Sequence, residues 1–265
     1  TFVKDSIRFA KKHELPVMFV TEDTVRSTPE ILKRLNGVAI NEGADRLCIC
    51  DTVGGVTPTA VKNIFEWYKS FLAERGAEGI ELDWHGHRDR GLGLINTLTA
   101  LSSGASRAHA CAQGIGERAG NTEMDLLLVN LKLLGWIDRD LKKLGEYVQC
   151  ASKATGRKIR KEYPVFGEDA FETATGVHAA AVIKAIKKGD KSIADLVYSG
   201  VPAGEFGLEQ TISIGPMSGK SNVVWFLENL GYDATEERVQ AVLNVAKKSK
   251  AILSKEEVLK AAKLT

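Results

Sequence analysis

The chain has 265 residues, and its 36 basic and 34 acidic residues leave a formal net charge of only +2 at pH 7. This balance gives no electrostatic basis for binding nucleic acid or an acidic membrane surface. The sequence has no signal-peptide pattern, no apolar run as long as a bilayer span, and four cysteines that fit neither a disulfide framework nor a four-thiolate zinc site, so we expect a cytoplasmic protein.

Four short apolar segments predict β-strands, and a helical pattern lies between each strand and the next. The strands are expected at Val17–Val20, Arg46–Cys50, Gly79–Leu82 and Arg107–Cys111. The helices are expected at Val3–Lys12, Pro29–Gly43, Pro58–Gly76 and Gly93–Gly104. Strand and helix alternating with a period of roughly 30 residues are typical of parallel βα units, whose sheet is covered by helices.

Polar residues follow the carboxyl end of each predicted strand. They include Glu22, Thr52, the pair His85 and His87, and Asn121. A (β/α)8 barrel builds its active site at this end of its strands, although an open doubly wound sheet would give the same layout. A closed barrel needs twice as many strands as the sequence predicts. Because the chain also begins within a helical run, we expect the N-terminal half of the barrel to be missing.

The segment His85-Gly86-His87 predicts a metal site. Side chains at positions i and i+2 of a strand point to the same face, so two imidazoles can converge on one cation. The alternative is a pair of structural histidines. Two histidines suit Zn, Mn, Fe or Ni, and added oxygen ligands would shift the preference toward Mn or Mg. His109 alternates into an apolar strand and is expected to be a core or wall residue.

The pattern changes to amphipathic helices in the second half of the chain. Helices are expected at Asp138–Thr155, Gly176–Lys188, Asn222–Leu230, Thr235–Lys250 and Lys255–Lys263, with a short strand at Gln210–Ile214. We therefore predict two domains, a half-barrel at residues 1–137 and a helical subdomain at residues 138–265.

Taken together, these motifs resemble the family of 2-isopropylmalate, homocitrate and citramalate synthases. The resemblance extends from Val17 to Tyr232. It rests on the ordered set Glu22-Asp23, Asp51-Thr52-Val53-Gly54, His85-x-His87-x-Asp89-x-Gly91, Gly114-x-Gly116-Glu117-Arg118-x-Gly120-Asn121, Thr175-Gly176-x-His178, Tyr198 and Ser218-Gly219-Lys220. One departure is Arg88, where the family usually carries Asn.

The resemblance implies an α/β fold: a (β/α)8 TIM barrel, of which this chain carries the C-terminal strands, followed by a mostly helical subdomain. It also implies a divalent metal (Mg, Mn or Zn) held by His85, His87 and Asn121. The alternative role for Asn121 is a helix N-cap. Acetyl-CoA would condense with a 2-oxo acid whose carbonyl the metal polarises. Glu22 would orient or shuttle a proton, unless it is a surface carboxylate. Thr52 would bind the substrate carboxylate, unless it caps a turn.

His178 and Tyr198 lie in the helical subdomain. The resemblance implies that this pair reaches the active site of a neighbouring subunit and carries out acid–base chemistry on the acetyl group, in a homodimer with exchanged subdomains. The alternative for His178 is a histidine packed on its alanine-rich helix.

The favoured activity is 2-isopropylmalate synthase, with 3-methyl-2-oxobutanoate as acceptor, in leucine biosynthesis. Homocitrate and citramalate synthases are alternatives, as are lyases and aldolases built on the same barrel. A further alternative is a non-catalytic or partner-dependent half-barrel subunit. The Arg-Asp motif that ends the family's first strand is not found before His85, which supports this alternative, whereas the intact set of ligand residues argues against it.

Overall fold

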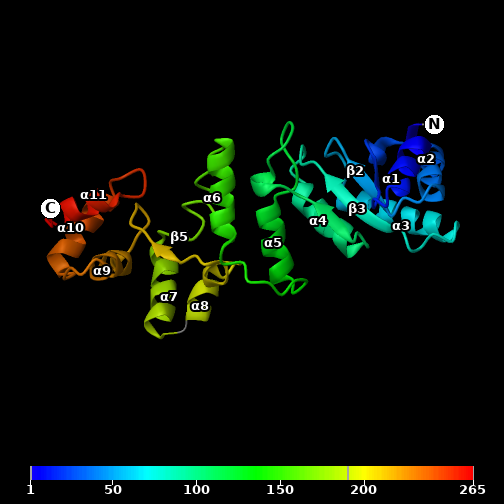
Figure 1. Cartoon of the computed structure of the whole chain (residues 1–265). Helices are drawn as coiled ribbons and strands as arrows, with labels where there is room; N and C mark the ends of the chain where they lie inside the picture. Colours follow the sequence, from blue (N-terminus) through cyan, green and yellow to red (C-terminus); the bar gives the residue numbers. More distant parts are fainter. Residues whose placement is uncertain (1, 190, 265) are drawn as a thin grey trace. The chain divides into compact units, whose positions relative to one another are not determined.

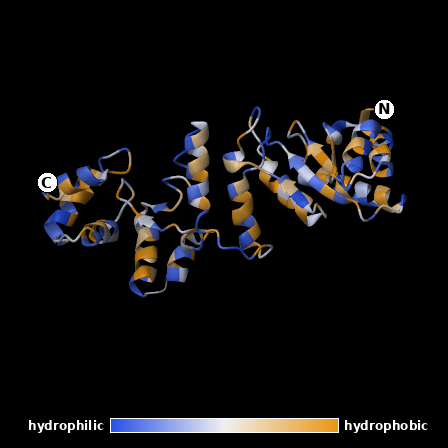
Figure 2. Cartoon of the chain, viewed as in Figure 1, coloured by the Kyte–Doolittle hydropathy of each residue, from blue (hydrophilic) through white to orange (hydrophobic). Residues whose placement is uncertain are grey.

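The computed structural model describes residues 2–189 and 191–264; Thr1, Asp190 and Thr265 lie outside the described residues. The chain divides into two compact units, Thr1–Trp136 and Ile137–Thr265. Figure 1 labels the elements of both, and Figure 2 shows apolar and polar residues alternating along their helices. Among the described residues no helix combines the length and apolarity needed to cross a bilayer.

The first unit is a four-stranded parallel sheet with helices between its strands, and the strands stand in the order β1-β2-β3-β4. The strands are β1 (Met18–Thr21), β2 (Arg46–Asp51), β3 (Glu81–Gly86) and β4 (Arg107–His109). The helices are α1 (Phe2–Lys12), η1 (Thr24–Arg26), α2 (Pro29–Asn41), α3 (Pro58–Ala73), α4 (Gly93–Ser102), η2 (Ala112–Gly114) and α5 (Met124–Leu133). This arrangement confirms the α/β fold class and the parallel βα units.

The two faces of the sheet differ in chemistry because strand side chains alternate. One face is apolar and packs on the helices, forming a core that includes Leu47, Ile49, Leu82, Trp84, Phe65 and Tyr68. The other face carries Cys48, Cys50, Asp83, His85 and His109, which contact one another within β2 and between the strands β2, β3 and β4. A polar inner face and an apolar outer face suit one segment of a barrel.

The structure corrects the predicted bounds at two strands. β3 begins at Glu81 and runs beyond Leu82 to Gly86, because its ladder with β2 continues as far as the pair Asp51 and Gly86. β4 ends at His109 and not at Cys111. Helix α5 was not predicted, since its leucine-rich sequence has no clear polar face.

The second unit is mostly helical, as expected. Its elements are α6 (Leu144–Thr155), β5 (Glu172–Thr173), α7 (Gly176–Lys187), α8 (Lys191–Leu196), η3 (Ala203–Phe206), β6 (Thr211–Ile212), α9 (Lys220–Asn229), α10 (Glu236–Ala246) and α11 (Lys255–Ala261). β5 and β6 pair in parallel. The last three helices bury a core of their own, which includes Val223, Leu227, Val239, Val242 and Val258.

Two predicted helices are too long, and side-chain hydrogen bonds explain both. The helix expected from Asp138 begins only at Leu144, because Asp140 Oδ1 accepts the Lys142 N–H at 2.9 Å and turns the chain. The helix expected to reach Lys250 ends at Ala246, whose carbonyl accepts the Ser249 hydroxyl at 2.8 Å.

Candidate active site

His85 and His87 lie side by side at the carboxyl end of β3. Their ring centroids are 5.3 Å apart, and the His85 ring is 5.6 Å from that of His109 on β4. Burial lowers the pKa of His85, and the nearby His109 and His87 lower it further. His85 is therefore mostly neutral at pH 7, the form in which an imidazole nitrogen can ligate a metal.

Asn121 lies beside His87, to which it is joined by an antiparallel β-bridge. Its Nδ2 donates to the Ile115 carbonyl at 3.2 Å and to Cys111 Sγ at 3.6 Å. Its Oδ1 is buried and, like Nδ1 of His87, has no hydrogen-bond partner among the described residues. Buried polar atoms without a partner are rare and commonly mark a place where a water or ion binds.

This donor set fits a divalent cation. Two imidazoles and an amide oxygen are ligands that Zn, Mn and Mg accept, with Zn preferring nitrogen and Mg preferring oxygen. Within residues 2–189 and 191–264, no group of three or more His, Cys, Asp or Glu side chains is arranged to hold a metal. A centre formed by the described residues would therefore depend on the Asn121 oxygen.

The glycines before Asn121 are required by close packing within a tight turn. Gly120 has φ +105°, and a Cβ there would lie 1.9 Å from the Gly114 carbonyl oxygen. At Gly116 a Cβ would lie 2.4 Å from Nδ2 of Asn121. A side chain at Gly116 would displace the Asn121 amide, and one at Gly120 would displace the Gly114 carbonyl that accepts the Asn121 N–H at 3.0 Å.

Glu22 and Thr52 follow β1 and β2. Glu22 is exposed. Thr52 Oγ1 accepts the N–H of Asp23 at 2.7 Å, so the hydroxyl caps the turn that follows β1. That oxygen still carries a proton of its own to donate. The role of each residue toward substrate stays a prediction.

The ion pair between Arg118 and Asp89 joins the loops at this end of the sheet. Both residues belong to the sequence motifs, but the sequence alone suggested no role for them. Arg118 donates to both Asp89 carboxylate oxygens, at 2.8 and 3.0 Å, and to the Thr52 carbonyl at 2.6 Å. Gly54 allows this close approach, since a Cβ there would lie 2.6 Å from the Asp89 nitrogen. The loops after β2, β3 and β4 are thus tied together.

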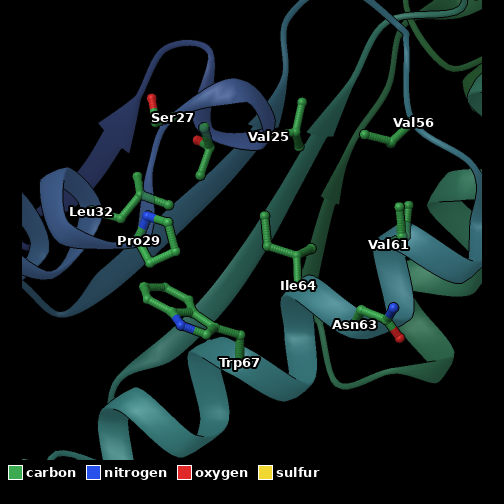
Figure 3. A pocket seen from close by; sticks show the side chains of 11 residues that line it. Val25, Ser27, Pro29, Leu32, Val56, Val61, Asn63, Ile64 and Trp67 are labelled. Carbon is green, nitrogen blue, oxygen red and sulfur yellow. The ribbon is translucent and has the colours of Figure 1, made fainter.

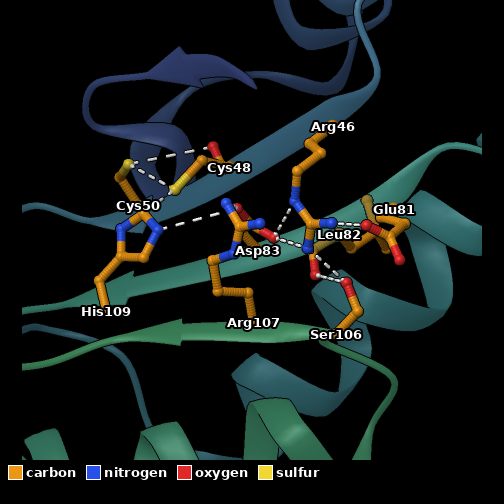
Figure 4. A network of polar contacts seen from close by, with 9 residues as sticks. All are labelled: Arg46, Cys48, Cys50, Glu81, Leu82, Asp83, Ser106, Arg107 and His109. Atoms are coloured by element: carbon orange, nitrogen blue, oxygen red, sulfur yellow. Dashed lines mark hydrogen bonds and ion pairs between the residues drawn. The ribbon is translucent and has the colours of Figure 1, made fainter. Parts of the chain in front are cut away.

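A buried ionic network on the polar face of the sheet was also missed (Figure 4). Asp83 is fully buried and accepts from Arg46 Nε at 2.9 Å, while Arg46 also pairs with Glu81 and donates to Ser106 Oγ at 2.6 Å. His109 Nε2 lies 3.7 Å from Asp83 Oδ2. His109 is thus a half-buried wall residue held by a carboxylate.

A crevice of about 310 Å³ lies between the start of α2 and helix α3 (Figure 3). Its lining is largely apolar and includes Val25, Leu32, Val56, Ile64 and Trp67. None of the predicted site residues lines it, so it lies apart from the histidine pair.

His178 and Tyr198 meet within the second unit. Their rings stack with centroids 4.1 Å apart and planes 28° apart, and both side chains are exposed. The start of α7 is fixed by the Ser218 hydroxyl, which donates to the Ala174 carbonyl at 2.6 Å, and by the Gly176 N–H, which donates to the Met217 carbonyl at 3.0 Å. His178 is thus exposed and stacks on Tyr198, and its role stays a prediction.

Parallel βα units with polar side chains gathered at the carboxyl ends of their strands define part of a TIM barrel. The HMGL-like family model matches residues 1–150. The chain belongs to the HMGL-like family, in the group of 2-isopropylmalate, homocitrate and citramalate synthases that its motifs resemble.

Among similar proteins, a homocitrate synthase of Pyrococcus horikoshii is 32% identical over 249 residues, which are 94% of this chain and 64% of that protein. A protein of Methanosarcina acetivorans, provisionally named (R)-citramalate synthase, is 32% identical over 90% of this chain and 47% of its own length. The chain thus spans about half to two thirds of the length of these relatives. A solved HMG-CoA lyase from Bacillus subtilis shares the fold, with a TM-score of 0.51 and 24% identity over 59% of this chain and 55% of the lyase.

Proposed function

We propose that this chain is part of a synthase that condenses acetyl-CoA with a 2-oxo acid, and that its two units are the catalytic half-barrel (1–137) and the helical subdomain (138–265). The observation that carries the proposal is the grouping of His85 and His87 with Asn121, in which a buried nitrogen and a buried oxygen have no partner among the described residues. The names of the relatives support the reaction class.

A divalent cation (Mg, Mn or Zn) bound by these three residues would polarise the ketone of the 2-oxo acid as a Lewis acid. His85 suits a ligand role because its lowered pKa keeps it neutral. Asn121 suits it because both donors of its amide are engaged, which leaves the oxygen for the cation.

The remaining roles concern protons and substrate. Thr52 would donate its hydroxyl proton to the substrate carboxylate. Glu22, exposed at the end of β1, would accept or relay a proton. His178 and Tyr198 would carry out acid–base chemistry at the acetyl group; their stacking holds the imidazole beside the phenol. We propose a homodimer in which this pair serves the partner's site.

A more specific proposal concerns which 2-oxo acid accepts the acetyl group. We propose 3-methyl-2-oxobutanoate, which would make the protein a 2-isopropylmalate synthase. The names of relatives with similar identity support the acceptors of homocitrate and citramalate synthases equally well. These acceptors differ in side chain, so one panel of branched, acidic and short 2-oxo acids compares them directly.

The test is release of free CoA from acetyl-CoA, measured with a thiol reagent over that panel. We expect release that requires both a divalent metal and one 2-oxo acid, and that falls at least 100-fold in His178→Ala while metal affinity stays unchanged. Metal binding without CoA release would favour the partner-dependent subunit, and acyl-CoA cleavage without condensation would favour a lyase. Failure to bind metal would contradict the proposal.

A further inference from the structure

Arg88, which directly follows the histidine pair, extends into the turn between η2 and α5. Its backbone N–H donates to the Gly120 carbonyl at 3.1 Å. Its Nε donates to the Ala119 carbonyl at 2.7 Å, its Nη2 donates to the Gln113 carbonyl at 3.2 Å, and its Nη1 pairs with the Glu123 carboxylate. Arg88 therefore holds four points along this turn, three through its side chain and one through its backbone N–H.

These four points lie on both sides of Asn121 in the sequence. The turn closes on itself as the Asn121 N–H donates to the Gly114 carbonyl at 3.0 Å. The guanidinium fills the space beside it, since a Cβ at Gly114 would lie 2.8 Å from Arg88 Cζ. The position of the Asn121 amide therefore depends on a side chain anchored at the end of β3.

The charge of Arg88 is compensated locally. The Arg88 and Glu123 side chains are only 18% and 14% exposed, and they pair directly. An unpaired guanidinium next to His87 would repel a bound cation with little screening by solvent. The Glu123 carboxylate neutralises the Arg88 charge and so reduces this repulsion, which allows an arginine next to His87.

We infer that Arg88 is a positioning residue that, together with Glu123, holds the Asn121 oxygen at the cation site; the inference rests on the proposed function. Arginine suits this role because its planar fork reaches several acceptors at once, which a lysine ammonium cannot do. Residues that orient a metal ligand typically contribute about 10- to 100-fold in metal affinity.

The test is titration of the metal-free 265-residue chain with Co²⁺, whose visible absorption reports affinity and coordination. The variants are Arg88→Ala, Asn121→Ala and the double variant. Arg90→Ala is the matched control, because Arg90 contacts the Gly55 carbonyl instead of the turn. We expect about 10- to 100-fold weaker binding and an altered spectrum for Arg88→Ala, a similar loss for Asn121→Ala, no further loss in the double variant, and no change in the control.

The outcomes separate the inference from the proposed function. If Asn121→Ala weakens binding but Arg88→Ala does not, or if the two losses add, the inference is wrong while the metal centre stands. If the unaltered chain does not bind Co²⁺, or binds it equally well after His87→Ala, the metal centre itself is wrong. If Arg88→Ala fails to fold, Arg88→Lys replaces it, and affinity between those of the unaltered chain and Asn121→Ala is then expected.

Discussion

Asp83 on β3 lies diagonally across from His109 on β4, whose ladder partner is His85, and an Asp83 carboxylate oxygen is 3.7 Å from Nε2 of the His109 imidazole. The same His109 ring stands 5.6 Å from the ring of His85. The buried ionic network and the histidine pair are therefore consecutive layers on one face of the sheet. The network supports the wall of the candidate active site.

Removing the Asp83 carboxylate should destabilise the first unit strongly. Asp83 is fully buried, and Asp83→Ala would leave the 14%-exposed Arg46 side chain without its buried partner. Breaking a buried ion pair typically costs about 3–5 kcal/mol. Urea unfolding should show a loss of this size. The double variant Arg46→Met with Asp83→Leu is the control, and it should be closer to the unaltered chain, because it leaves no buried charge unpaired; Glu81, the other partner of Arg46, is 53% exposed.

Metal affinity should depend on His87. His87→Ala removes a proposed ligand whose buried Nδ1 has no protein partner among the described residues, so we expect at least a 100-fold loss of Mn²⁺ or Zn²⁺ affinity by calorimetry with little loss of stability. His13→Ala is the matched control, since His13 packs against Phe9 on α1, with ring centroids 4.5 Å apart. Equal affinity in both variants would show that the metal binds elsewhere.

Adding one methyl group at Gly120 should disrupt the turn that carries Asn121. Gly120→Ala would place Cβ 1.9 Å from the Gly114 carbonyl oxygen at a positive φ, and strain of about 1–3 kcal/mol is expected from the backbone alone. Gly135→Ala tests the backbone effect separately, because Gly135 also has a positive φ but has no atom within 4 Å of its added Cβ. Thermal unfolding should show a clearly larger loss at Gly120.

Asp45 should make the first unit sensitive to acid. The N–H of Val17 and the Lys11 ammonium, at 2.7 and 3.0 Å, hold the pKa of Asp45 below its usual 3.8. A carboxyl whose pKa is lowered by folding stabilises the fold above its unfolded pKa, and this stabilisation is lost as the pH falls through the folded pKa.

The free energies of unfolding of the unaltered chain and Asp45→Asn should therefore differ at pH 6. We expect a difference of at most about 1 kcal/mol, because the Asp45 side chain is 46% exposed and solvent screens such pairs. Below pH 3.8 the difference should shrink. A difference that is constant from pH 6 to pH 3 would exclude this role of the carboxylate.

The sequence predicts the elements whose signals are local. Apolar strands before His85 and proline at the starts of α2 and α3 placed the parallel units correctly. Helix α8 was missed because it has only six residues. At this length intrinsic helix propensity is too weak to be read from sequence, and packing decides the conformation.

The contacts around the candidate site depend on register and could not be read from sequence. Arg46 meets Asp83 because Arg46 pairs with Glu81 in the ladder, which brings together residues 37 positions apart. Arg88 reaches Glu123 over 35 positions. The His-x-His spacing is visible in one strand, whereas these partnerships arise only when neighbouring strands align.

The strand order β1-β2-β3-β4 also bears on how the first unit can form. Each of the strands β2, β3 and β4 pairs with the strand before it in the chain, so these pairings form between consecutive segments. As the chain leaves the ribosome, every new strand meets an edge already in place. The four strands can therefore pair in chain order, and the histidine pair and the Asn121 turn, which lie at and after the ends of β3 and β4, come together only after β1 and β2 have paired.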